Sequence, residues 1–220
     1  MSYNIAIDGP AGAGKSTIAK QVSKQLGFIY VDTGAMYRAM ALYMLKKGID
    51  PEDSEAVARA CEDADISIKY IDQVQCVFLN GENVNDQIRT NEVSDAASKT
   101  STVKTVRQKL VKLQQEMAAS EDVVMDGRDI GTAVLPGADL KIYMTASSRV
   151  RAKRRYDELI EKGVECTLAD IEKEIIERDE RDMNREESPL KRAEDAVLLD
   201  TSDMTIDEVV SAILALKISA

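Results

Sequence analysis

A glycine-rich segment near the N-terminus has the residue types and spacing of a polyphosphate-binding loop. Residues 9–17 read GPAGAGKST and contain the pattern GxxxxGK[ST], directly after an apolar segment and at the start of a helical pattern. Glycines let the backbone wrap around phosphates, so that N–H groups and the helix N-terminus face the anion. Lys15 would reach the outer phosphates, and Ser16 would offer its hydroxyl to magnesium. We therefore expect ATP or GTP to bind Gly9, Pro10, Ala11, Gly12, Ala13, Gly14, Lys15, Ser16 and Thr17.

A carboxylate for the same metal is predicted at the end of a later strand. Asp126 ends the apolar segment VVMD, where P-loop proteins hold magnesium directly or through water. An isolated aspartate at a strand end could equally cap a helix or a turn. Magnesium is thus expected with the nucleotide, with Ser16 and Asp126 as its protein ligands.

Arginine is concentrated in one part of an acidic chain. The 220 residues include 29 lysines and arginines against 39 aspartates and glutamates, which gives a net charge of -10. Eight of the thirteen arginines nevertheless lie between positions 149 and 192. A phosphoryl-transfer enzyme needs cations around the moving group, and arginine supplies them as permanently charged bidentate forks.

Two helical patterns in this region each place arginines on one face. Arg151 and Arg155 are four residues apart, and Arg178, Asp182 and Arg185 follow i, i+4, i+7 spacing. We expect the second set to form a single stripe, with two cations beside one carboxylate, which suits a phosphate and a hydroxyl. The many acidic neighbours also allow a solvated helix with ion pairs.

Two absences and the net charge narrow the range of functions. The chain has no histidine, which excludes Ser-His and Cys-His nucleophile pairs and His-containing zinc sites. Its net charge of -10 makes it a poor candidate for binding the backbone of a nucleic acid polymer. It contains neither NKxD nor DxxG, which disfavours a switch GTPase.

The cysteines and the N-terminal segment indicate a cytoplasmic protein. Cys61, Cys76 and Cys166 are odd in number, widely separated and without a CxxC pair, which fits a reducing compartment. The N-terminus enters an apolar strand without a basic segment, and no apolar run approaches 18 residues. We expect no membrane partner.

Hydrophobic periodicity predicts an α/β domain with a five-stranded parallel sheet covered on both faces. At about 150 residues per domain, 220 residues fit one domain with an elaboration better than two. The expected strands are Tyr3–Asp8, Phe28–Asp32, Val123–Asp126, Leu140–Met144 and Val197–Asp200. The expected helices are Lys15–Leu26, Ala35–Lys47, Asn91–Ser98, Val103–Ala119, Ser147–Lys162, Thr167–Glu187 and a last one capped by Thr205-x-x-Glu208.

The pattern changes between Cys61 and Arg89. The segments ISIKYI and VQCVFL, followed by Asn80-Gly81-Glu82-Asn83, predict a small antiparallel β-rich insert with tight turns. In open α/β sheets ligands bind beyond the carboxyl ends of the strands. The phosphate loop, Asp32-Thr33-Gly34 and Gly127-Arg128-Asp129 all follow strands, so we expect these three loops to converge on one crevice.

The ordered motifs GPAGAGKST, DTGAMYR, IRTNEVSDAAS, DGRDIGT and RDERDMNR resemble the bacterial-type cytidylate kinases over nearly the whole chain. The resemblance implies a P-loop nucleoside monophosphate kinase fold and transfer of the terminal phosphoryl group of ATP to CMP or dCMP with magnesium. It also implies one domain, 1–220, with a core (about 1–33, 120–148 and 188–220), a monophosphate-binding region with the insert (about 34–119) and a short helical lid (about 149–187).

The same resemblance implies roles for individual residues. Arg38, Arg128 and Arg185 would surround the monophosphate, with Arg178 and Asp182 on the sugar side. Ser98, Arg107 and Asp129 match the cytosine-reading positions, and Thr33 stands where some members have serine. Without the resemblance, Ser98 and Arg107 would each be taken for a surface residue of a helix. Arg151 and Arg155 resemble lid arginines that close over ATP, with Gly163 as a hinge. The catalytic set is Lys15, Arg128, Arg185, Arg151 and Arg155.

No general base is expected, because a nucleoside monophosphate is already an anionic nucleophile near neutral pH. Another small P-loop kinase, with UMP or AMP as acceptor, and a non-catalytic ATP-binding protein remain the alternatives. A monomer is the family default.

Overall fold

The computed structural model describes residues 2–72, 74–161 and 163–219. Two compact units make up the chain. The first comprises the residues up to Tyr30 together with those from Glu121 onward, and the second comprises Val31–Ser120.

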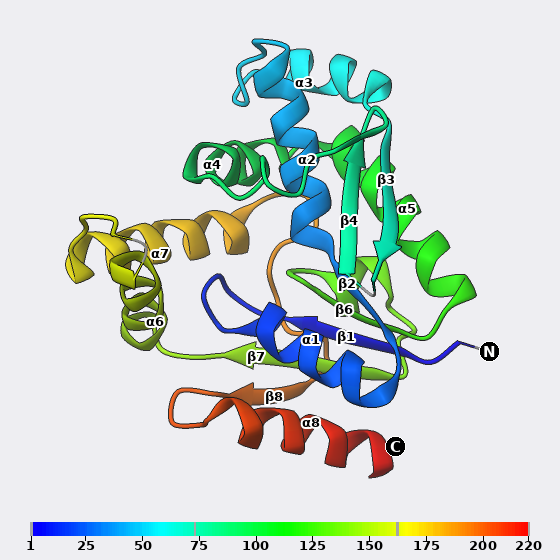
Figure 1. Cartoon of the computed structure of the whole chain (residues 1–220), viewed down its shortest axis with the longest axis vertical. Helices are drawn as coiled ribbons and strands as arrows, with labels where there is room; N and C mark the ends of the chain where they lie inside the picture. Colours follow the sequence, from blue (N-terminus) through cyan, green and yellow to red (C-terminus); the bar gives the residue numbers. More distant parts are fainter. Residues whose placement is uncertain (1, 73, 162, 220) are drawn as a thin grey trace. The chain divides into compact units, whose positions relative to one another are not determined.

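A five-stranded sheet forms the centre of the first unit, and its strand β2 continues into Val31 and Asp32 of the second (Figure 1). Its strands are β1 (Asn4–Asp8), β2 (Ile29–Asp32), β6 (Val123–Gly127), β7 (Leu140–Thr145) and β8 (Val197–Asp200). Their order is β2-β6-β1-β7-β8, and β1 runs parallel to both β6 and β7, as β7 does to β8. All five predicted strands are confirmed, with bounds shifted by no more than one residue. The apolar residues of β1 and β6 are almost fully buried, as parallel strands require.

Two of the helices described in this unit pack against the sheet, and the other two pack against each other. The helices are α1 (Lys15–Leu26), α6 (Ser148–Glu161), α7 (Leu168–Asn184) and α8 (Ile206–Ser219). The apolar side chains of α1 and α8 form one core cluster with those of β1 and β7 (Figure 1). Thr205 and Glu208 bond reciprocally through backbone N–H groups, so the predicted capping box of α8 is confirmed. The predicted end of the Ser147 helix at Lys162 lies outside the described residues.

The predicted helix Thr167–Glu187 is too long. Thr167 caps α7 by accepting the N–H of Asp170, as expected, but the helix ends at Asn184. Arg185 follows in an extended conformation, with φ -64° and ψ 142°. The sequence does contain signals for this helix end. The residues directly after Met183 are polar, and the apolar positions of the helical pattern stop there. Sequence patterns also missed a π-helical turn at Ile130–Val134.

The described residues of the second unit form four α-helices, a short 3-10 helix at Cys61–Asp63 and a small antiparallel sheet. The helices are α2 (Thr33–Lys46), α3 (Ser54–Ala60), α4 (Asn91–Thr100) and α5 (Lys104–Ser120), of which α3 was not predicted. The sheet consists of β3 (Ile66–Ile71), β4 (Val74–Leu79) and β5 (Glu82–Asn83) in that order. Between β4 and β5, Asn80 and Gly81 have φ values of 49° and 82°. These are the positive angles of a two-residue hairpin turn, so the predicted insert is confirmed.

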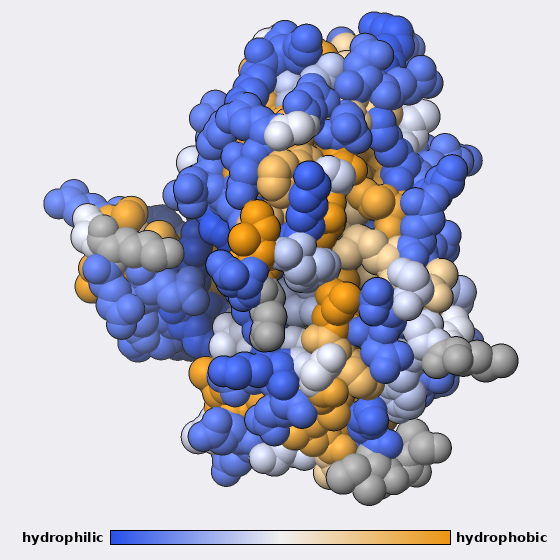
Figure 2. Space-filling view, turned by 45° about the vertical axis from the view of Figure 1, so that its right-hand side comes forward, coloured by the Kyte–Doolittle hydropathy of each residue, from blue (hydrophilic) through white to orange (hydrophobic). Residues whose placement is uncertain are grey.

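The core of the second unit lies around α2. Met36, Met40 and Met44 are fully buried on one face of this helix, and they belong to a cluster with side chains of α4, α5 and the small sheet. The face shown in Figure 2 is mostly hydrophilic, with apolar residues exposed among the hydrophilic ones. Within the described residues, no helix is both long and apolar enough to span a membrane.

Candidate active site

The phosphate loop joins β1 to α1 and needs glycine at its first position. Gly9 has φ 147°, and a Cβ built there would lie 1.9 Å from the carbonyl oxygen of Met144 on β7. Any side chain would therefore displace the loop from the neighbouring strand. Gly14 has φ 85° and forms the N-cap of α1, which leaves the first N–H groups of the helix available to an anion.

Lys15 is buried at the start of α1 and points back along the loop. Its Nζ donates a hydrogen bond of 2.7 Å to the carbonyl oxygen of Pro10. Burial, reinforced by the nearby Arg128, lowers the pKa of Lys15 to about 7, against the attraction of Asp126 and Asp8. The negative charge of a polyphosphate bound in the loop would stabilise the charged ammonium form of Lys15.

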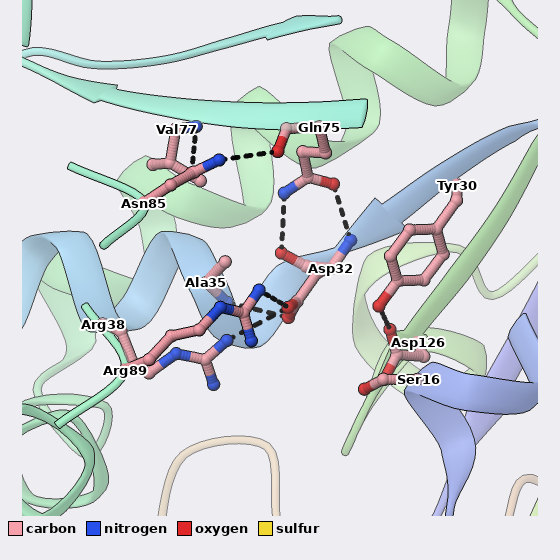
Figure 3. A network of polar contacts seen from close by, with 10 residues as sticks. All are labelled: Ser16, Tyr30, Asp32, Ala35, Arg38, Gln75, Val77, Asn85, Arg89 and Asp126. Atoms are coloured by element: carbon pink, nitrogen blue, oxygen red, sulfur yellow. Dashed lines mark hydrogen bonds and ion pairs between the residues drawn. The ribbon is translucent and has the colours of Figure 1, made fainter. Parts of the chain in front are cut away.

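The two predicted magnesium ligands lie side by side. Ser16 Oγ donates to Asp126 Oδ2 over 2.8 Å, and the Tyr30 hydroxyl donates to Asp126 Oδ1 over 2.9 Å (Figure 3). Carboxylate and hydroxyl oxygens are the hard ligands that magnesium prefers, usually one or two from the protein, with water and phosphate oxygens completing its shell. The residues therefore fit a magnesium–nucleotide complex. Tyr30 gave no sequence signal, because only strand pairing brings it to Asp126.

The register between strands β1 and β6 places the loop after β6 beside the phosphate loop. Asp8, the last residue of β1, pairs with Gly127, the last residue of β6. The Asp8 carboxylate accepts the backbone N–H groups of Ile130 and Gly131, each over 2.7 Å, and so anchors the π-helical turn. Burial raises the pKa of Asp8 to about 6, despite the two N–H donors, and Asp129 adds to the rise. Asp8 precedes the glycine motif directly, yet sequence reasoning did not assign it a role.

Arg128 and Arg185 are each held by a carboxylate of the first unit. Arg128 Nε donates to Asp182 Oδ2 over 2.9 Å, and Arg185 Nη2 lies 3.4 Å from Asp129 Oδ1. Burial alone would raise the pKa of Asp182, but Arg128 holds it below its ordinary value, with help from Arg178 and Arg185.

The expected stripe on α7 is incomplete. Arg178 and Asp182 are one helical turn apart, but Arg185 lies beyond the end of the helix, so the prediction of three residues on one helical face is wrong. The backbone turn there is closed instead by Arg185 Nε donating to the carbonyl oxygen of Ser188 over 2.7 Å. Arg185 still meets the Gly127-Arg128-Asp129 loop, through Asp129 rather than through the stripe.

The two predicted lid arginines of α6 have different environments. Arg151 is buried and makes three contacts: with Ala146 O over 2.9 Å, with Ala11 O of the phosphate loop over 2.9 Å, and with Asp179 over 2.6 Å. Arg155 is 41% exposed and lies 3.4 Å from Glu158. Asp179, which joins α7 to α6 through Arg151, was also missed, because the two residues are 28 positions apart.

In the second unit, a carboxylate at the start of α2 organises two arginines. Asp32 caps α2 by accepting the N–H of Ala35 over 2.9 Å. Its Oδ2 lies 3.0 Å from Arg38 and 3.8 Å from Arg89. A Cβ on Gly34 would lie 3.1 Å from Arg38 Nη1, so glycine leaves room for this pair. Thr33 is buried at the first position of the helix.

Ser98 and Arg107 belong to the same unit, on α4 and α5. They are only 7% and 4% exposed, so neither is an ordinary surface residue. Arg107 Nη1 donates to the carbonyl oxygen of Ser101 over 3.3 Å, and Ser101 Oγ donates to the carbonyl oxygen of Ser98. The Arg107 guanidinium also lies 5.5 Å from the centroid of the Tyr37 ring, a cation–π arrangement.

A parallel sheet of this order, with a phosphate loop after its central strand and a serine at the start of the next helix paired with an aspartate on the neighbouring strand, defines the class of P-loop kinases. Among solved structures, a shikimate kinase from Bacteroides thetaiotaomicron matches with a TM-score of 0.50 and 12% identity over 98% of both chains. An uncharacterized protein from Eubacterium ventriosum matches with a TM-score of 0.55 and 11% identity over 100% of both. At such identities these likenesses concern the fold alone.

Within that class, the chain belongs to the cytidylate kinase family, whose model matches residues 5–218. The cytidylate kinase of Caldicellulosiruptor bescii is 52% identical over 97% of this chain and 94% of its own length. That of Lactobacillus johnsonii is 50% identical over 95% of this chain and 91% of its own.

Proposed function

We propose that this protein transfers the terminal phosphoryl group of ATP directly to CMP and dCMP, forming CDP and dCDP. The observation that carries the proposal is membership of the cytidylate kinase family over nearly the whole chain, combined with a phosphate loop whose lysine, serine and partner aspartate lie together. The matched range, residues 5–218, includes both the phosphate loop and the arginine-rich segments, so the match spans donor and acceptor residues.

On the donor side, the backbone N–H groups of the phosphate loop, to which Pro10 contributes none, bind the ATP phosphates, and Lys15 exchanges the Pro10 carbonyl oxygen for a phosphate oxygen. Ser16 and Asp126 hold magnesium, which neutralises phosphate charge and orients the phosphates when it is bound. Arg151 and Arg155 act as lid arginines. The contact of Arg151 with Ala11 O supports this role, because it ties α6 to the phosphate loop.

On the acceptor side, arginines bind the phosphate of CMP. Arg128 and Arg185 bind the monophosphate of CMP together with Arg38, and the carboxylates that hold them keep their guanidinium groups oriented before binding. Arg178 and Asp182 bind the sugar, and Thr33 adds a hydroxyl.

Cytosine is read by Ser98, Arg107 and Asp129. The base presents an exocyclic amine as donor and O2 and N3 as acceptors, which a carboxylate, a hydroxyl and a guanidinium complement. Uracil would instead turn its O4 toward the carboxylate.

The residues act by position and charge, and none of them needs to remove a proton. The CMP phosphate is already a nucleophilic anion near neutral pH. The required contributions are alignment of the acceptor oxygen with ATP, exclusion of water and positive charge over the transferring group. We further infer a monomeric, cytoplasmic enzyme, and the three unpaired cysteines support a reducing compartment.

The test is ADP release by the purified protein with ATP and magnesium, offered CMP, dCMP, UMP, AMP and GMP separately. Turnover confined largely to CMP and dCMP is expected. Turnover mainly with UMP or AMP would replace the acceptor assignment while leaving a P-loop kinase, and no turnover with any of the five would favour an ATP-binding protein. Sedimentation of the same sample measures whether it is a monomer.

A further inference from the structure

The β-rich insert reaches the start of α2 through one side chain. Gln75, on β4, donates from Nε2 to the carbonyl oxygen of Asp32 over 3.2 Å and accepts the Asp32 N–H at Oε1 over 2.8 Å (Figure 3). Its carboxamide therefore pairs with both backbone groups of one residue. Only this orientation of the amide works, because the reverse would set donor against donor and acceptor against acceptor.

Asp32 is the residue on which the local polar cluster depends. Its backbone forms the N-cap of α2, and its carboxylate binds the Ala35 N–H and two guanidinium groups. Asp32 and Arg38 are 10% and 21% exposed, so their ion pair is shielded from water. One carboxylate between two arginines leaves one net positive charge, which favours an anionic ligand.

Hydrogen bonds from Asn85 hold the part of β4 that carries Gln75. Asn85 Nδ2 donates to the carbonyl oxygen of Gln75 over 3.1 Å, and Asn85 Oδ1 accepts the N–H of Val77 over 2.9 Å. These bonds bind the chain after β5 to β4 on either side of Cys76. Gln75 thus presents its amide from a strand that is hydrogen-bonded on both edges, by β3 and by this segment.

We propose that Gln75 is a positioning residue of the acceptor site, which holds the Asp32 peptide so that the Asp32 carboxylate orients Arg38 for the monophosphate. The inference rests on the proposed function, in which Arg38 binds the CMP phosphate. It gives the insert a role in that function, since Gln75 belongs to β4 of the insert and pairs with both backbone groups of Asp32. A guanidinium that is oriented in advance loses less freedom when it binds an anion.

Steady-state kinetics of Gln75→Ala test the proposal. Loss of two hydrogen bonds to the Asp32 backbone is expected to raise KM for CMP about tenfold, with kcat lowered by less than about threefold and KM for ATP unchanged. Gln75→Met keeps the length of the side chain without either hydrogen bond, and the same change in KM is expected for it. Gln87→Ala is the matched control, because Gln87 belongs to the same insert but donates to the exposed Glu82.

A double-mutant cycle separates positioning from general stabilisation of the insert. In an Arg38→Ala background, Gln75→Ala is expected to change KM for CMP by less than about twofold, because the residue through which it acts is gone. Equal effects in both backgrounds would overturn the proposal, as would an unchanged KM in either folded Gln75 variant while wild type phosphorylates CMP. If Gln75→Ala does not fold, Gln75→Met decides. No CMP turnover by wild type would overturn the proposed function, and this inference with it.

Discussion

Substitution of Asp8 by asparagine should change how the stability of the protein depends on pH. Asp8 is buried at the end of β1, where its two oxygens accept the N–H groups of Ile130 and Gly131. An asparagine side chain has nearly the same shape but no charge, and a hydrogen-bond donor, the amide nitrogen, takes the place of one of the two carboxylate oxygens. The substitution therefore removes the titration and leaves one backbone N–H without its acceptor.

The magnitude follows from the pKa of Asp8, which burial raises from 3.8 to about 6. At 1.36 kcal/mol per pKa unit, the difference corresponds to about 3 kcal/mol. Between pH 4 and 6 the native protein keeps a proton that the unfolded chain has released, so the Asp8 contribution to stability falls as pH rises. The full free-energy cost of burying the charged carboxylate is present above about pH 6, and none of it is present below about pH 4, where the group is protonated in both states.

Urea unfolding of wild type and Asp8→Asn at pH values from 4 to 7.5 measures this contribution. The free energy of unfolding of wild type, relative to the variant, is expected to fall by about 3 kcal/mol across this range. At neutral pH the two proteins should be similar, because relief of the buried charge offsets an unsatisfied N–H that costs about 1–3 kcal/mol.

Asp139→Asn is the matched control, since the exposed Asp139 carboxylate accepts one backbone N–H, that of Asn4, at the other end of β1. The effect of Asp8→Asn is expected to exceed that of the control. A stability difference between wild type and Asp8→Asn that does not change from pH 4 to 7.5 would refute the assignment of a buried, titrating carboxylate.

Three further substitutions test the donor and acceptor residues. Lys15→Met should leave a folded protein with turnover lowered by at least about a hundredfold, and ATP should no longer raise its melting temperature; retained turnover would contradict the role of Lys15. Asp126→Asn should raise the magnesium concentration needed for half-maximal rate by about tenfold, measured by titration at fixed ATP, and an unchanged midpoint would argue against Asp126 as a ligand. Asp129→Asn should lower the ratio of kcat/KM for CMP to that for UMP by about tenfold or more while KM for ATP stays constant; a constant ratio would remove Asp129 from base reading.

Local sequence patterns were sufficient for most elements of this fold. The bounds of α1 and β8 were predicted to the residue, because apolar periodicity is strong there and glycine or a polar segment marks each end. The hairpin turn at Asn80-Gly81 was predicted because few other dipeptides tolerate two positive φ angles. The unpredicted α3 has only seven residues, too few for periodicity to show.

The residues of the candidate site also fall into two groups, those that a local sequence pattern identifies and those that it does not. Lys15 and Ser16 were identified because a phosphate loop is contiguous in sequence, and every group it needs follows from backbone conformation. Residues that hold a site residue from a distant element were not identifiable in this way. Tyr30, Asp179 and Gln75 each reach a site residue from a strand or helix that is distant in the chain.

The sequence by itself determined the class of chemistry, the family and the placement of the phosphate loop, since these depend on motifs with fixed spacing. Only the tertiary structure decided which carboxylate holds which arginine: Asp182 with Arg128, Asp129 with Arg185, and Asp32 with Arg38. Each acid has several basic residues within reach along the chain. Strand register and helix ends select one of them, because an ion pair in a buried site requires atoms within about 4 Å.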